Sequence, residues 1–241
     1  MGKTELNAIS TFLKGAACAA LAFAGMPSLA QDTLAPSANT ANWGELVVEN
    51  EGGHLVGNPD AEAQLIEFMR YTCSHCAEFA RTGEGAIKLL YVPTGKVSLE
   101  VRHLIRDPID LTAALLTQCG GPDDFFANHE AIILDFDKWM AKARVATQAQ
   151  QARWRFGSIG SRAQAIASDL DFYEIMEARG YDRPQIDRCL TDEAKARAIA
   201  EQSQADAATY GLRGTPTFIL GGETLNVRTW ETIQPLLDRL F

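Results

Sequence analysis

The sequence predicts an α/β fold that carries a large inserted helical segment. An apolar run at residues 65–69 is typical of a buried strand, and it leads through Cys73-Ser74-His75-Cys76 into a helical pattern. Residues 96–103 alternate apolar and polar side chains, which indicates a half-buried strand. Residues 107–210 then show no strand pattern, and strand patterns return only after them.

The elements are expected in the order strand, helix, strand, helical insertion, two strands and helix. Residues 43–49 favour a further short strand at the start, and the glycines after it favour turns. The helix after the motif is expected over residues 77–90, with a kink or break at Gly83 and Gly85. Apolar residues recur every three or four positions in the insertion, which predicts about four to six helices.

The last thirty residues predict a hairpin and a helix. The runs TFIL and ETLNV flank Gly221-Gly222, which is typical of two strands joined by a glycine turn. Apolar residues at helical spacing between positions 230 and 240 predict a final amphipathic helix.

The first thirty residues have the pattern of a secretory signal peptide. Lysines precede an apolar stretch at residues 15–25, and Ser28-Leu29-Ala30 supplies the small residues of a cleavage site. That stretch is too short to span a bilayer as a helix. Residues 31–42 are small and polar, which favours a flexible leader. The sequence therefore predicts export to an oxidising compartment.

The net negative charge of the chain argues against negatively charged partners. Acidic residues number 31 and basic residues 22, which gives a formal net charge of −9. An acidic surface disfavours binding to nucleic acid and to anionic membranes. We therefore expect neither as a partner.

The cysteines change in number if the chain is exported. Of five cysteines, Cys18 would leave with the signal peptide. Four would remain, and an even number in an exported protein favours two disulfides. The economical pairing joins Cys73 to Cys76 and Cys119 to Cys189, the second bond closing a loop of about 70 residues.

The Cys-x-x-Cys motif has three interpretations. At the start of a helix, free N–H groups and the positive end of the dipole favour a thiolate, which suits a reactive dithiol. The same spacing also fits a permanent disulfide or half of a zinc site. Zinc needs about two more ligands, but no second such motif exists and the other histidines show no ligand spacing. We expect a redox dithiol and no metal.

Three local patterns resemble the DsbA-like thiol:disulfide oxidoreductases of the bacterial periplasm. Leu65-Ile66-Glu67-Phe68 leads into the CSHC motif, Gly95-Lys96-Val97 opens a strand, and Gly214-Thr215-Pro216-Thr217-Phe218 precedes the final hairpin. The resemblance implies a thioredoxin fold with a large inserted helical domain. Its expected bounds are residues 43–106 and 211–241 for the thioredoxin-like domain and 107–210 for the insertion.

The resemblance also implies roles for the motif. Cys73 is the expected nucleophile and Cys76 the resolving thiol. His75 is expected to stabilise the Cys73 thiolate, although a solvent-facing histidine without a role fits the sequence too. Ser74 stands where the strong oxidants of the family have proline, so the redox poise does not follow from the resemblance.

Other positions carry expected roles. Glu67 lies in an apolar strand, where a carboxyl with a raised pKa would accept the Cys76 proton; an edge-exposed carboxylate is the alternative. Pro216 is expected to follow a cis peptide bond, so that Thr215 can pair with an extended substrate segment; an ordinary trans proline opening a strand is the alternative. A second disulfide such as Cys119–Cys189 occurs in some family members; a second redox pair is its alternative.

The leading functional prediction is a periplasmic enzyme that introduces disulfides into exported proteins. It needs no cofactor beyond its own Cys73–Cys76 disulfide, and a DsbB-type membrane partner linked to quinones is expected to re-oxidise it. We expect a monomer. The alternatives are a disulfide isomerase or specialised reductase and, from another class, a non-catalytic chaperone. Isomerases of this fold usually carry a separate dimerisation domain, for which residues 31–57 are too short.

Overall fold

The computed structural model describes residues 42–241. The predicted signal peptide at residues 1–30, and the predicted leader up to residue 41, lie outside the described residues. Within the described chain, no helix is long and apolar enough to cross a membrane.

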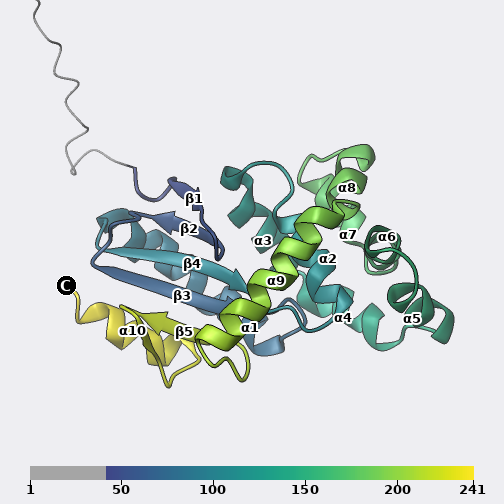
Figure 1. The fold of residues 1–241 in the computed structure, drawn as a ribbon. Helices are drawn as coiled ribbons and strands as arrows, with labels where there is room; N and C mark the ends of the chain where they lie inside the picture. The colour runs from purple at the N-terminus through teal and green to yellow at the C-terminus, as the bar shows by residue number, and fades with distance from the viewer. Residues whose placement is uncertain (1–41) are drawn as a thin grey trace, which may run out of the picture. The chain divides into compact units, whose positions relative to one another are not determined.

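A six-stranded sheet forms the centre of the fold, with the strand order β1-β2-β4-β3-β5-β6 (Figure 1). Only β3 and β4 pair in parallel, and the helical turns after the CSHC motif connect them. The other neighbouring strands pair antiparallel. The strands are β1 (Val47–Glu49), β2 (His54–Gly57), β3 (Ala63–Met69), β4 (Val97–His103), β5 (Thr217–Leu220) and β6 (Glu223–Thr224). This is the thioredoxin fold with inserted helices that the sequence predicts.

The strand β2 was not expected. The sequence interpretation assigned its two flanking glycine clusters to turns, and only four residues lie in the strand between them. All four are nevertheless buried, because β2 pairs with both β1 and β4. The predicted strand at residues 43–49 is shorter than expected, beginning only at Val47, and β6 ends at Thr224 rather than at residue 227.

The helix after the motif departs from regular α geometry. The helix α1 (Ser74–Phe79) passes into π-helical turns at Ala80–Glu84 and Ile87–Tyr91, followed by a 3-10 turn at Val92–Thr94. The predicted break at the glycines is therefore a change of helix type. A Cβ on Gly83 would lie 2.7 Å from the Phe79 ring, so glycine allows this buried ring to pack against the turn.

The helical insertion holds eight α-helices in the described chain, more than the predicted four to six. Side chains at Asp107, Thr147, Ser158, Asp182 and Asp192 accept backbone hydrogen bonds at helix starts, so short helices begin at close intervals. The helices are α2 (Pro108–Thr117), α3 (Phe125–Leu134), α4 (Phe136–Arg144), α5 (Gln148–Arg155), α6 (Ile159–Asp169), α7 (Phe172–Ala178), α8 (Arg183–Leu190) and α9 (Glu193–Thr209).

The insertion and the sheet share one hydrophobic core. Figure 1 shows α2 to α8 gathered beyond one end of the sheet, while the long α9 runs back toward it. Buried residues of the sheet, such as Leu99, and of the insertion, such as Leu116 and Phe172, belong to one continuous cluster. The final helix α10 (Trp230–Asp238) adds Ile233 and Leu237 to this cluster.

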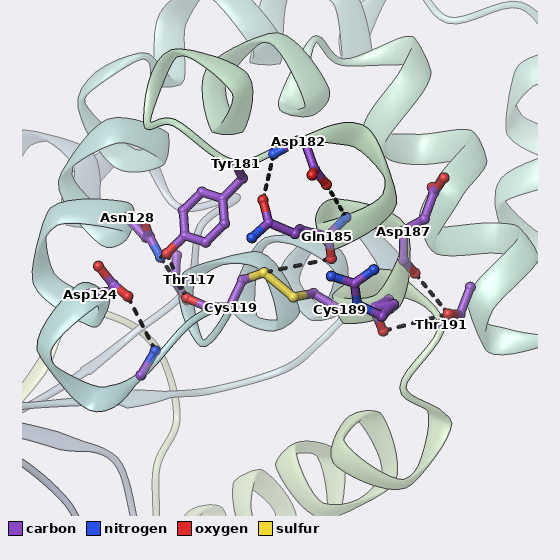
Figure 2. Close-up of a disulfide and its surroundings, with 12 residues drawn as sticks. Thr117, Cys119, Asp124, Asn128, Tyr181, Asp182, Gln185, Asp187, Cys189 and Thr191 are labelled. Carbon is purple, nitrogen blue, oxygen red and sulfur yellow. Dashed lines mark hydrogen bonds between the residues drawn. A yellow bond between two sulfur atoms is a disulfide. The ribbon is translucent and has the colours of Figure 1, made fainter.

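A disulfide ties the insertion together. Cys119, just after α2, is bonded to Cys189 in α8, with the Cα atoms 5.6 Å apart (Figure 2). The Cys119 carbonyl accepts hydrogen bonds from the Asn128 amide and the Tyr181 hydroxyl, each at 2.9 Å. The bond therefore fixes the end of α2 against α8 while α3 holds its backbone.

Replacing both Cys119 and Cys189 with alanine is expected to lower the free energy of unfolding. The bond closes a loop of 70 residues, for which the chain-entropy model gives about 4 kcal/mol. Urea denaturation measures the loss. The control uses proteins in which Cys73 and Cys76 are alanine, so that reductant acts on the Cys119–Cys189 bond alone. Reductant should then destabilise the protein that has this bond and should not change the stability of the protein that lacks it. Equal stability of the bonded and unbonded proteins would contradict the prediction.

Candidate functional site

The CSHC motif lies where β3 ends and α1 begins. Cys73 is the N-cap of α1, with extended backbone angles, and its sulfur accepts a hydrogen bond from the Cys76 N–H at 3.4 Å. Both cysteines are free thiols and both are buried. The structure therefore shows a reduced dithiol whose first sulfur faces the N-terminal end of a helix.

Several hydrogen bonds lower the pKa of the Cys73 thiol to about 5. The largest contribution is the hydrogen bond with the Cys76 side chain; burial opposes it, and the Thr215 side chain and the backbone N–H groups of Cys76 and His75 assist it. Cys73 is therefore almost fully ionised at neutral pH. The thiolate is the nucleophilic form of cysteine, so this sulfur suits attack on a disulfide.

Cys76 has the opposite character. It is 0% exposed, and burial raises its pKa well above the ordinary value, with further increases from the Cys73 side chain and the Glu67 charge. The two thiols of one motif thus differ in protonation: Cys73 is a thiolate and Cys76 carries its proton.

Glu67 lies in β3, fully buried beside the dithiol. Neither of its carboxyl oxygens has a hydrogen-bond partner among the described residues. Burial, followed by the charges of Glu84 and Cys73, raises its pKa well above the ordinary value. A neutral buried carboxyl at this position can give a proton to a nearby sulfur or take one from it.

The loop before β5 faces Cys73. The Thr215–Pro216 peptide bond is cis, and the Cys73 sulfur lies 3.3 Å from the Thr215 carbonyl oxygen, to which only the protonated thiol can donate. Arg70 donates to the Thr215 hydroxyl at 3.3 Å. Residues from two ends of the chain, on either side of the insertion, are thereby held against each other.

The insertion also contacts the site, which the sequence interpretation missed. The Thr72 N–H and hydroxyl both donate to the Asp110 carboxylate, at 2.9 and 2.8 Å, and the hydroxyl also contacts Asp107. Burial and the charge of Asp107 raise the pKa of Asp110 to about 6. Thr72 directly precedes Cys73, so the first turn of α2 helps to set the position of Cys73. Asp107 is the N-cap of α2 and Pro108 is its first residue, a pair typical of a helix start, but nothing in the sequence connects that start to Thr72.

His75 has an exposed side chain in the first turn of α1. Among the described residues its ring makes no hydrogen bond, whereas its backbone N–H contributes to the low pKa of Cys73. A role for the ring stays a prediction.

Three other histidines meet in the core. His54 and His129 stack on Phe125, and the Tyr71 hydroxyl lies between His103 and His129. No group of three or more potential metal-ligating side chains occurs within residues 42–241. Their sequence spacing gave no sign of this meeting, because three separate elements carry them.

Comparison with known proteins places this geometry in context. A family model described as Thioredoxin matches residues 49–239. The structure is similar to a crystal structure of a protein-disulfide isomerase from Novosphingobium aromaticivorans, with a TM-score of 0.75 and 42% identity over 78% of this chain and 97% of that one. It also resembles alpha-DsbA1 of Wolbachia pipientis in fold, with a TM-score of 0.63 and 20% identity over 82% of this chain and 95% of that one.

A curated relative from Rickettsia bellii is provisionally named a protein-disulfide oxidoreductase. It is 22% identical over 191 residues, which cover 79% of this chain and 65% of the relative. The chain therefore spans somewhat less than two thirds of the length of this relative.

The thiolate absorbance of the reduced protein is expected to titrate with a midpoint near pH 5, and Cys73→Ser should abolish that transition.

The stability of the reduced protein is expected to depend on pH. Because the pKa of Cys73 is lower in the folded state than in the unfolded state, its thiolate stabilises the folded reduced protein at alkaline pH. That contribution is lost as the pH falls through about 5. Denaturation of the reduced and the oxidised protein at a series of pH values measures the difference between their free energies of unfolding. A pH-independent difference would contradict the prediction.

Replacing His75 with leucine is expected to raise the pKa of Cys73. The change removes a ring that can donate a proton or carry a positive charge near the thiolate, while it keeps the backbone N–H. The same absorbance titration measures the shift, and Glu78→Gln in the same helix serves as an exposed control. An unchanged midpoint in the His75→Leu protein would contradict the prediction and would mean that His75 lowers the pKa of Cys73 through its backbone N–H alone.

Proposed function

The chain belongs to the thioredoxin family, and on that basis we propose that it is a thiol:disulfide oxidoreductase that introduces disulfides into exported proteins. The observation that carries the proposal is the opposite protonation of the two thiols, with the pKa of Cys73 lowered to about 5 and that of Cys76 raised. A thiolate that is stable in the folded protein favours the reduced enzyme, and hence donation of the disulfide to a substrate.

The reaction begins with the enzyme disulfide. A substrate thiolate attacks the sulfur of Cys73, the Cys73–Cys76 bond breaks, and the electron pair leaves on Cys76, which takes up a proton from Glu67. A second substrate thiolate then attacks the substrate sulfur of the mixed disulfide, and Cys73 leaves as a thiolate. The substrate has lost two electrons and both thiol protons. One of these protons, by way of solvent, replaces the proton that Glu67 gave to Cys76, and the other remains in solvent.

Seating of the substrate follows from the cis-proline loop. The Thr215 carbonyl lies 3.3 Å from the Cys73 sulfur, so an extended peptide that pairs with the Thr215 backbone brings its own cysteine to the nucleophile. Hydrogen bonds between the substrate backbone and the Thr215 backbone do not depend on the side chains of the substrate, so this mode of binding suits a range of unfolded substrates. The predicted signal peptide supports action in the periplasm, with re-oxidation by a DsbB-type membrane partner linked to quinones.

Isomerisation is the second candidate, and one observation favours it. The solved relative at 42% identity is described as a protein-disulfide isomerase. An isomerase must work from the reduced dithiol, which needs a reductant that keeps it reduced. The low pKa of Cys73 favours donation of the disulfide, as the oxidase requires, but an isomerase could also use the reduced form that it stabilises. The redox potential therefore has to decide between the two.

The reduction potential of Cys73–Cys76 measured against glutathione tests the proposal. The shift in the pKa of Cys73 alone stabilises the reduced form by about 3 kcal/mol at neutral pH, equivalent to about 60 mV. We therefore expect a potential well above the glutathione poise, together with oxidation of a reduced, unfolded protein. Cys73→Ser should abolish this activity, and Cys76→Ser should trap the mixed disulfide.

A reduction potential close to that of thioredoxin would contradict the oxidase proposal and would favour a disulfide isomerase or a reductase. Protection of unfolded proteins that survives Cys73→Ser, without any oxidation by the unaltered protein, would instead favour the chaperone.

A further inference from the structure

A second buried carboxyl lies in the helical turns that follow the dithiol. Glu84 ends the first π-helical turn after α1 and is 1% exposed. Its two oxygens lie 3.1 and 3.0 Å from Nε2 of His129 in α3. The pair thus joins the helix that carries the CSHC motif to the helical insertion, away from water.

The contact chain continues toward the nucleophile. Nδ1 of His129 lies 2.8 Å from the Tyr71 hydroxyl, and the same hydroxyl lies 3.2 Å from Nε2 of His103. Tyr71 is 1% exposed and belongs to the loop that leads into Cys73. Each hydrogen-bonding nitrogen of His129 is therefore occupied, and its ring cannot turn away from Glu84 without breaking one of these contacts.

The charges around Glu84 favour its ionised form, so it is the negatively charged member of this series of hydrogen-bonded side chains. Burial alone would raise its pKa, but the charge and hydrogen bonds of His129 and the charge of Lys88 outweigh burial and lower it. Burial lowers the pKa of His103 well below its ordinary value and that of His54 to about 4. These two rings are neutral at neutral pH, so the positive charges that act on Glu84 are those of His129 and Lys88.

Glu67 is surrounded by groups that oppose its ionisation. It is fully buried, Glu84 and Cys73 act on it as negative charges, and it acts in turn on Cys76. The hydroxyl of Tyr71, which experiences the charges of both glutamates, remains neutral because burial raises its pKa well above the ordinary value. The two charges that raise its pKa, those of Glu84 and Cys73, are both negative.

We propose that Glu84 is a positioning residue for proton transfer at the dithiol, whose buried negative charge, held in place by His129 and Tyr71, keeps Glu67 protonated until the disulfide opens. This deepens the proposed function and rests on it. When the Cys73–Cys76 bond breaks, the proton of Glu67 passes to the sulfur of Cys76. The negative charge that results on Glu67 then experiences the negative charge of Glu84. Repulsion between these two buried charges then favours the return of a proton to Glu67.

The test uses dithiothreitol as the reducing probe and follows the opening of the Cys73–Cys76 disulfide across pH. The rate, divided by the concentration of the dithiothreitol thiolate, should fall once Glu67 loses its proton. Glu84→Gln keeps a hydrogen-bonding side chain but removes the charge, so the fall is expected at lower pH. Between the two midpoints, the variant should react several-fold more slowly than the unaltered protein, and Glu84→Asp should restore most of the profile.

Glu100→Gln provides a matched control. Glu100 is also a buried glutamate, 3% exposed and paired with Arg102 at 2.7 Å. It lies opposite Ile66 in the register of β3 and β4, so it points to the sheet face away from Glu67. Its profile should match that of the unaltered protein. An unmoved profile in Glu84→Gln, or an equal shift in Glu100→Gln, would overturn the proposal.

A second measurement needs no variant of Glu84. The carboxyl carbon of Glu67, labelled with 13C and assigned by its loss in Glu67→Gln, should titrate far above the ordinary glutamate range in the oxidised protein. A midpoint in the ordinary range would overturn the proposal even if Glu84→Gln failed to fold. Because dithiothreitol is a small dithiol, both measurements stand whether or not exported proteins prove to be substrates, which the protein-oxidation assay decides separately.

Discussion

The register of the central strand β3 is the constraint on which the site depends. Met69, the last residue of β3, lies opposite His103 in β4, and Phe68 lies opposite Thr217 in β5. Three loops therefore leave the sheet at one edge: the loop into the CSHC motif, the loop into the helical insertion, and the cis-proline loop. A shift of one residue in β3 would turn Glu67 to the other face and move Thr215 away from the Cys73 sulfur.

The sequence predicted those parts of the site whose signals are local. The apolar run before the motif, the alternation in β4 and the Thr215-Pro216 dipeptide each carry their information within about eight residues. Sequence alone missed β2, since four residues between glycines resemble a turn, and it undercounted the insertion, since short helices share one periodic pattern. Contacts such as Thr72 with Asp110 and Glu84 with His129 form only after the insertion packs, and neither spacing nor composition records them.

The two thiols of the motif show how one turn of chain can create two chemical environments. Cys73 occupies the N-cap, where N–H groups point at its sulfur, while Cys76 lies one turn further in and is buried. Environments that push two pKa values apart separate the roles of two otherwise identical groups. In the proposed reaction, this separation makes Cys73 the sulfur that the substrate attacks and that later leaves as a thiolate, and it makes Cys76 the sulfur that takes up a proton. A neutral carboxyl such as that of Glu67 would be useful to the second of these thiols.

The helical insertion takes part in this arrangement and does more than cover it. It supplies Asp110 to Thr72, the residue before Cys73, and His129 to the buried carboxyl of Glu84. Both contacts are ionic or charge-assisted and lie in or near the core, where an unpaired charge is costly. Removing the insertion would therefore leave Glu84 and Thr72 without partners as well as exposing apolar surface. The continuous core and these two contacts together make the redox site a property of the whole described chain.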